Sequence, residues 1–176
     1  RSAAAIDENS SSVITITATL SNATYQDVTV SIGASGGTEG TDYATISDIT
    51  ISAGSTTGTA SLDPNDDSVY EDDESVTVTI EGVSGGGASE SGSQSVSITI
   101  TENESAPTVT LAVSATSIAE NAGTSLTLTA TLSGATDETV TVALGTSGSA
   151  TEGTDYTDGS GVINDITISA GATTGT

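Results

Sequence analysis

The sequence lacks most of the residues on which enzyme chemistry and transition-metal binding usually depend. Its 176 residues include no Cys, His, Trp, Phe or Met, and the only aromatic side chains are four Tyr. Without Cys and His there is no thiol chemistry, no common zinc or copper site and no Ser-His-Asp triad. A carboxylate-pair glycosidase would still need a pocket with aromatic walls, which this composition does not supply. We therefore expect that the chain is not an enzyme.

Basic residues are almost absent as well. Lys and Arg together contribute one residue against 24 Asp and Glu, so the net charge is −23. One Arg cannot form a basic patch, which excludes nucleic acid as a partner. No apolar run approaches the ~18 residues that span a bilayer, and no secretory signal is recognisable, so we expect no membrane insertion in this segment. The acidic excess favours an extracellular or cell-surface location.

Large apolar side chains are also scarce, since the chain has 14 Ile, 13 Val and 7 Leu. This supply, together with the high net charge, lies at the edge of the composition that is typical of disordered chains. We therefore expect that something besides apolar burial helps to hold the chain folded.

What is present is a strong strand pattern. Apolar residues alternate with Thr and Ser, which predicts strands with one face on a core and one face in water. The pattern covers Ile14 to Leu20, Val28 to Ile32, Ile49 to Ile51, Val76 to Ile80, Val96 to Ile100, Val109 to Val113, Leu126 to Leu132, Val140 to Leu144 and Ile166 to Ile168. Such alternation suits antiparallel sheets, and Gly-rich and Ser-rich breaks separate the segments. The sequence therefore predicts an all-β protein.

The chain also contains an internal repeat. Ala18 to Ser21 recurs 112 residues later at Ala130 to Ser133, and Asp48 to Gly54 recurs 117 residues later at Asp165 to Gly171. The change in offset predicts a four-residue insertion in a loop after Tyr156. A unit of about 115 residues suits one β-sandwich domain, and tandem copies suggest an array.

The two copies differ in what they contain. We predict a first repeat over residues 1–105 that lacks its first strand, a short linker at 106–107, and a second repeat over 108–176 that comprises only the N-terminal part of the unit. Because the chain starts without Met, we expect a fragment of a longer array. The alternative is a filament subunit that is completed by strands of neighbouring chains, because the incomplete second copy should expose strand edges.

Acidic residues are concentrated in one segment, Asp63 to Glu74, in which seven of twelve residues are Asp or Glu. Two charges ~5 Å apart repel by ~3 kcal/mol at an effective dielectric of ~20. The segment is therefore either a well-solvated loop or a site that shares a cation. Calcium fits such a loop best because it accepts six to eight oxygen ligands, whereas magnesium resists dehydration.

Further acidic residues are expected at the same end of a Greek-key domain, where alternate loops meet. They are Glu8, Asp42, Glu102 and Glu104. Alternative interpretations stay open, since Glu8 suits a solvated surface and Asp42 suits a structural turn, as does its repeat Asp155. We interpret Asp48 and its repeat Asp165 as surface turn residues, and Asp72 and Asp73 as additions to the local field.

These segments together resemble the Calx-beta domain family. The matching features are Glu8-Asn9, Gly40-Thr41-Asp42-Tyr43, the Asp66-Asp67-x-x-Tyr70-Glu71-x-Asp73-Glu74 pattern, and Ile98-Thr99-Ile100-Thr101-Glu102-Asn103-Glu104. The resemblance implies an immunoglobulin-like Greek-key β-sandwich in two tandem units, the second truncated, with calcium bound at one end. The family occurs in sodium–calcium exchangers and as tandem repeats in large bacterial surface proteins.

The resemblance also implies a ligand set and a function. The implied metal ligands are Glu8, Asp42, Asp66, Asp67, the Val69 carbonyl, Glu71, Glu74, Glu102, Asn103 and Glu104 in the first copy, and Glu120 and Asp155 in the second. The implied function is a calcium-binding structural repeat of an extracellular adhesin or surface fibre, in which Ca²⁺ stiffens the acidic pole and the approach to the next repeat. Its expected partners are neighbouring repeats of the same protein and, in a fibre, identical chains. A calcium-sensor module is the alternative.

Overall fold

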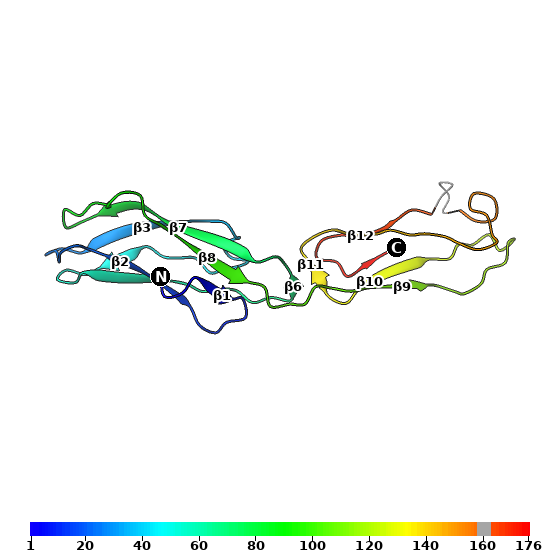
Figure 1. The fold of residues 1–176 in the computed structure, drawn as a ribbon, viewed down its shortest axis with the longest axis horizontal. Coiled ribbons are helices and arrows are strands. Elements are labelled where there is room, and N and C mark those ends of the chain that lie inside the picture. The colour runs from blue at the N-terminus through cyan, green and yellow to red at the C-terminus, as the bar shows by residue number, and fades with distance from the viewer. Residues whose placement is uncertain (158–162) are drawn as a thin grey trace. The chain divides into compact units, whose positions relative to one another are not determined.

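The computed structural model describes residues 1–157 and 163–176, which form two compact units. The first unit comprises Arg1–Asp67 and Asp72–Asn103, and the second comprises Ser68–Glu71 and Glu104–Thr176. Most of the insertion expected after Tyr156 falls at 158–162, outside the described residues. Every regular element of the described chain is a strand (Figure 1). The described residues contain no helix with the length and apolarity to cross a membrane.

The first unit is a sandwich of two sheets. A five-stranded sheet has the order β1-β8-β7-β3-β4, and a two-stranded sheet pairs β2 with β5. Their bounds are Ala5–Asp7 (β1), Ser95–Thr101 (β8), Glu74–Ser84 (β7), Val28–Ser35 (β3), Ile49–Ile51 (β4), Ile14–Thr19 (β2) and Thr57–Leu62 (β5). All pairs are antiparallel except β1 with β8, which is parallel. The predicted all-β sandwich is confirmed.

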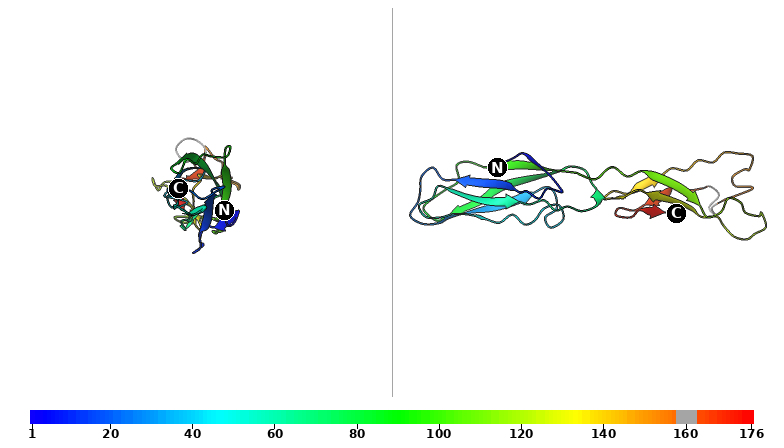
Figure 2. Two further views of the ribbon diagram at one scale, coloured as in Figure 1. Left: turned by 90° about the vertical axis from the view of Figure 1, so that its left-hand side faces the viewer. Right: turned by 90° about the horizontal axis from the view of Figure 1, so that it is seen from below.

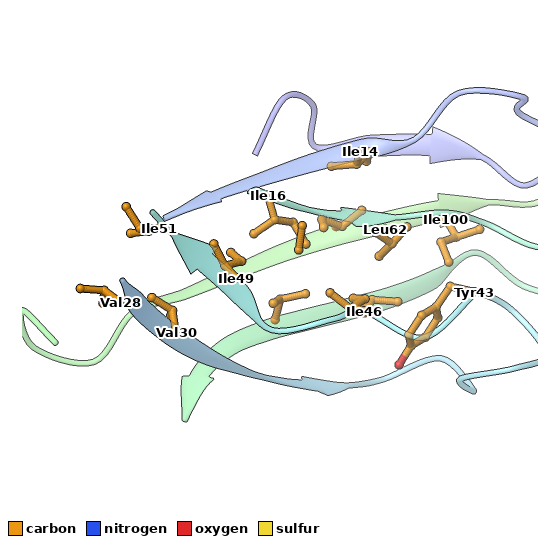
Figure 3. Close-up of a cluster of buried hydrophobic side chains, with 14 residues drawn as sticks. Ile14, Ile16, Val28, Val30, Tyr43, Ile46, Ile49, Ile51, Leu62 and Ile100 are labelled. Atoms are coloured by element: carbon orange, nitrogen blue, oxygen red, sulfur yellow. The ribbon is translucent and has the colours of Figure 1, made fainter. Parts of the chain in front are cut away.

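The core of the first unit lies between these two sheets, and the apolar members of the alternating segments build it (Figure 3). The buried residues are Ile14, Ile16, Val28, Val30, Tyr43, Ile46, Ile49, Ile51, Ala60, Leu62, Val76, Val78, Ile98 and Ile100. Period-two alternation thus sent every second side chain inward from both sheets, as the pleat of a strand requires. Tyr43 and Ile46 join this core from the connection between β3 and β4.

Two repeated residues fix the close packing of the strands. Asp48 Oδ1 accepts a hydrogen bond of 2.9 Å from the Ile32 N–H, beside the register shift of β3, and Asp165 Oδ1 accepts an equivalent bond of 2.9 Å from Leu144. Each of these surface aspartates therefore accepts a backbone hydrogen bond, one from β3 and the other from the residue two positions after β12. Gly58 is also repeated, as Gly175, because a Cβ at either position would lie 2.5 Å from a backbone oxygen.

The second unit has a smaller core. Its strands are β9 (Val109–Val113), β10 (Leu128–Leu132) and β14 (Thr174–Gly175) in one sheet, β12 (Val140–Val142) with β13 (Ile166–Ile168), and β6 (Val69–Tyr70) with β11 (Ala135–Thr136). β9 runs antiparallel beside β10 (Figure 2, right). Four buried residues form its centre: Ala130, Leu132, Ile166 and Ile168. Five partly buried residues pack against them, namely Leu128, Val140, Val142, Leu144 and Ala172.

The internal repeat explains this difference. By the sequence offsets, β10 and β14 correspond to β2 and β5, while β12 and β13 correspond to β3 and β4. Within its described residues, the second unit has no counterpart of β7 or β8. All five residues of β9 are consequently exposed, so the expectation that one face of this strand is buried is wrong. The strand begins where the alternation predicts, but the layer that would cover it is not there.

Candidate metal site

A buried carboxylate marks the end of β1. Glu8 follows this strand directly and is only 6% exposed. Its N–H donates a hydrogen bond of 3.0 Å to the carbonyl of Thr101, the last residue of β8. Its Oε1 accepts a hydrogen bond of 3.2 Å from the N–H of Asp67. The parallel pairing of β1 with β8 therefore brings Glu8 to the chain segment that follows Thr101.

Two further carboxylates come from that segment. One carboxylate oxygen each of Glu8, Glu102 and Glu104 lies within 4.8 Å of the other two. Glu102 and Glu104 are half-buried, and the Oε2 atom of Glu104 is inaccessible to solvent. We call Glu8, Glu102 and Glu104 the three-carboxylate cluster.

The spacing within the three-carboxylate cluster fits calcium. Ca²⁺ binds oxygen at about 2.3–2.6 Å, so two of its ligands lie at most about 5 Å apart. All three oxygens of the cluster meet this limit. Without a cation, each pair of ionised groups, at most 4.8 Å apart, would repel by at least about 3 kcal/mol at an effective dielectric of about 20.

Asp42 is held by its own turn. Its Oδ2 accepts a hydrogen bond from the Thr38 N–H, and its carbonyl accepts one of 3.0 Å from the Asn65 N–H. The Asn65 side chain donates a further bond of 3.0 Å to the Thr41 carbonyl. Asp42 therefore shapes the loop that supports the start of the acidic segment, and it lies outside the three-carboxylate cluster.

The acidic segment contributes to both units. Asp66 and Asp67 are exposed members of the first unit, whereas Val69 and Glu71 belong to the second. Val69 lies in β6, where the next carbonyl, that of Tyr70, accepts a hydrogen bond of 3.3 Å from Asp137 of the β11 side. Because carbonyls alternate along a strand, the Val69 carbonyl points away from β11. Glu74 begins β7, and Asn103 is exposed beside the three-carboxylate cluster in sequence.

Among the described residues, neither candidate of the second repeat belongs to a cluster of three or more acidic groups. Glu120 is exposed next to a turn in which Ala122 N–H bonds to the Ala119 carbonyl. Asp155 Oδ2 accepts a hydrogen bond of 2.6 Å from the Thr151 N–H, which repeats the bond of Asp42 in the first copy. The repeated Asp therefore has a repeated structural role, as the turn interpretation expected.

Two supporting acids were not identified from the sequence. Asp73 Oδ1 accepts a hydrogen bond of 3.0 Å from the N–H of Glu102, and Asp7 Oδ1 accepts one of 2.7 Å from the Thr101 hydroxyl. Both bonds fix the position of the backbone at Thr101 and Glu102, where β8 ends. The sequence suggests only that Asp73 adds to the local negative charge. Its position within the acidic segment is the one signal in the sequence that points to its support of Glu102.

Tyr43 has a displaced titration because its ring lies in the core. Burial of the ring raises the pKa of its hydroxyl above the ordinary value of 10.0, and the negative charges of Glu39 and Asp42 raise it further. Tyr43 therefore remains protonated well into the alkaline range, and it caps the core below the Asp42 turn.

Comparison with known proteins supports a structural role. Residues 1–104 match the model of the LapA domain, and residues 102–174 match the model of the Calx-beta domain. No curated protein and no solved structure matches the chain with significant similarity. Both matched families consist of structural, adhesin-like domains and are not enzyme families. The chain thus belongs to the LapA domain family, and its residues 102–174 are similar to the Calx-beta domain, which confirms the resemblance to the Calx-beta family for that part of the chain.

Proposed function

We propose that this chain is a calcium-stabilised structural repeat of an extracellular or cell-surface adhesin. The observation that carries the proposal is the three-carboxylate cluster, in which a buried Glu8 meets Glu102 and Glu104 within 4.8 Å. The adhesin-like character of both matched domains agrees with this function. Neighbouring repeats of the same protein are the proposed partners.

The proposed mechanism is electrostatic. A bound Ca²⁺ supplies two positive charges, which convert repulsion among the three carboxylates into attraction. Glu8 is fixed at the end of β1, and Glu102 follows β8, so one ion would join the ends of these two strands. The protein's own residues orient the ligands: Asp67 N–H holds Glu8, and Asp73 holds Glu102.

Ion binding should also matter for stability, because the core of each repeat is modest. A ligand that binds only the folded state stabilises it by about 2.7 kcal/mol at one hundred times its Kd. Extracellular calcium modules bind with Kd values of about 10⁻⁴–10⁻³ M. At about 10 mM calcium these Kd values correspond to about 1.4–2.7 kcal/mol. The first unit should therefore melt roughly 6–20 °C higher than in chelator, given a shift of about 4–8 °C per kcal/mol.

The experiment is a calcium titration followed by calorimetry at each concentration. We expect a rising melting temperature with calcium, a much smaller rise with magnesium, and loss of the calcium response in Glu102→Gln. Asp72→Asn is the matched control, since it removes one charge from an exposed position in the same acidic segment. Equal melting temperatures in chelator and in calcium would refute the proposed function. A Kd near 10⁻⁶ M would instead favour a calcium sensor.

A further inference from the structure

Tyr25 is the most exposed of the four tyrosines. Its side chain is 85% exposed, whereas that of Tyr43 is 2% exposed. The side chains of Tyr70 and Tyr156 are half-buried. The fold does not require an aromatic residue at position 25, because its counterpart in the second repeat, 112 positions later, is Asp137. The exposed ring of Tyr25 is therefore available for chemistry.

Tyrosine is also the only readily oxidised residue type in the chain. Cys, Met, Trp and His are all absent, so no thiol, thioether, indole or imidazole competes for an oxidant. A one-electron oxidant must therefore act on a phenol, and exposure decides which phenol it reaches first. One exposed aromatic residue does not by itself indicate a binding surface, but this reaction requires only access to the ring. Composition and exposure together select Tyr25.

The end of the first unit that carries Tyr25 is almost free of charge. Three connections meet there, and none of them contains an acidic residue (Figure 1). They comprise residues 20–26, 52–56 and 84–89, and we call them the neutral end. The N–H of Gly54 donates a hydrogen bond of 2.8 Å to the Thr24 carbonyl, and a Cβ at Gly86 would lie 2.9 Å from the Thr24 side chain. These contacts hold the three connections together beside Tyr25.

The neutral end and the three-carboxylate cluster lie at opposite ends of β8, which begins at Ser95 and ends at Thr101, directly before Glu102. A strand of seven residues is about 23 Å long. The net charge of −23 opposes the association of two copies, but charges more than about 8 Å apart are largely screened at physiological ionic strength. Only Asp27 and Glu90 directly flank the neutral end, and each accepts a backbone hydrogen bond. Two copies can therefore approach each other through their neutral ends.

We propose that Tyr25 is the site at which one-electron oxidation joins two copies of this chain covalently. Hydrogen peroxide, acting through a haem peroxidase, takes one electron and the phenolic proton from each Tyr25 and leaves a phenoxyl radical. The two radicals form one carbon–carbon bond between ring positions next to the oxygens, and the hydrogens at these positions move to the oxygens. One peroxide accepts the two electrons and two protons and becomes two molecules of water. The proposal is independent of calcium, because the neutral end contains no member of the three-carboxylate cluster.

The test treats the full chain with hydrogen peroxide and a haem peroxidase, and it follows covalent dimers on denaturing gels and dityrosine by its fluorescence. Tyr25→Phe keeps the ring and removes the hydroxyl, and Tyr156→Phe is the matched control at a half-buried position. We expect the initial rate of dimer formation to fall by about tenfold or more in Tyr25→Phe and to stay within about twofold of the native rate in Tyr156→Phe. Digestion after acidic residues, followed by mass spectrometry, should place the link between two peptides that end at Asp27.

A second pair of variants tests the approach through the neutral end. Asn22→Asp adds one negative charge to the neutral end, and Asn121→Asp adds the same charge at an exposed position of the second unit. At low ionic strength we expect Asn22→Asp to slow dimer formation several-fold and Asn121→Asp to leave the rate nearly unchanged, because repulsion acts where the two copies meet. A salt concentration of about 1 M should remove the difference, since the screening length is then about 3 Å.

Several outcomes would overturn the proposal. Undiminished dimer formation in Tyr25→Phe, or a link that maps to Tyr70 or Tyr156, would overturn the assignment of the site. Oxidation of Tyr25 without covalent dimers would overturn the role of a second copy. Equal slowing by Asn22→Asp and Asn121→Asp would mean that the overall charge governs the encounter, and it would overturn the role of the neutral end.

Discussion

Replacing Glu8 by Gln should have opposite effects on stability with and without calcium. In chelator, Glu8 repels Glu102 and Glu104 across distances of at most 4.8 Å, and each pair is worth about 3 kcal/mol at an effective dielectric of about 20. Gln removes both repulsions and keeps an oxygen for the hydrogen bond from Asp67 N–H. Since neighbouring groups and solvent relax, we expect a net gain of only about 1–2 kcal/mol in the free energy of unfolding.

In calcium the order should reverse. The native chain gains about 2.7 kcal/mol at one hundred times its Kd, whereas Glu8→Gln has lost one anionic ligand of three and gains little. Calorimetry of both chains in chelator and in calcium gives the four melting temperatures that the comparison needs. Hydrogen exchange of the β8 amides assigns each transition to the first unit, because β8 lies within its core.

Asp72→Asn is the control for charge alone. It removes one negative charge at an exposed position, so the free energy of unfolding should change by about 0.5 kcal/mol or less in both buffers. If Glu8→Gln were less stable than the native chain in chelator and still showed the full calcium response, repulsion within the cluster would not govern this part of the fold. The electrostatic reasoning would then be wrong.

Three further comparisons test the packing and the titration of Tyr43. Ile98→Ala should cost about 2–5 kcal/mol in denaturant unfolding because Ile98 is fully buried, whereas Leu111→Ala, at a position 53% exposed, should cost less than about 1 kcal/mol. Gly58→Ala should destabilise the first unit, since its Cβ would lie 2.5 Å from a backbone oxygen. Gly82→Ala is the control, because its Cβ meets open space and the free energy of unfolding should change by less than about 1 kcal/mol. Equal shifts in melting temperature for the two variants would contradict this account. Tyr43 binds its proton more tightly when folded, so stability should fall as the pH rises above the ordinary tyrosine pKa of 10.0, and Tyr43→Phe should make alkaline unfolding curves less steep between this pH and the raised pKa.

The strands of the first unit were predictable because the alternation of apolar residues in each strand agrees with the burial of one face of its sheet. Val28, Val30 and Ile32 follow a period of two, and their strand packs against a partner layer that accepts its apolar face. β9 has the same period, yet all of its residues are exposed. Alternation predicts which side chains share a face, but burial requires a second layer, which the pattern of a single segment does not contain.

The cluster was only partly predictable. Glu8, Glu102 and Glu104 were expected at one end of the domain because of their places before and after strands, and they were expected as ligands because of the resemblance to the Calx-beta family. Their actual meeting depends on the parallel pairing of β1 with β8, and no local pattern of a three-residue strand specifies this pairing. The density of charge in Asp63 to Glu74 drew attention to its carboxylates, whereas the structure uses the backbone N–H of Asp67 and the side chain of Asp73 as supports.

The turn residues show that one repeat can have two explanations. Asp42 and Asp155 recur in the same motif, which is compatible with a repeated ligand and with a repeated turn. Each accepts a hydrogen bond from the N–H four residues earlier, so the turn accounts for the repetition, while the role of both residues as ligands stays a prediction. A carboxylate that shapes a turn uses the same residue type at the same place as one that binds an ion, and only the positions of neighbouring oxygens distinguish the two.

The parallel pairing of β1 with β8 also has a mechanical consequence. β1 lies near the N-terminal end of the first unit and β8 near its C-terminal end, and residues Ala5 to Asp7 pair with Thr99 to Thr101 in the same direction. Tension applied at the two ends of this unit would slide these strands past each other along their axes. Their interstrand hydrogen bonds would then be loaded simultaneously in shear, and would not open one after another as in a zipper. An ion that joined Glu8 to Glu102 would link the same two strands at their C-terminal ends and so oppose this sliding.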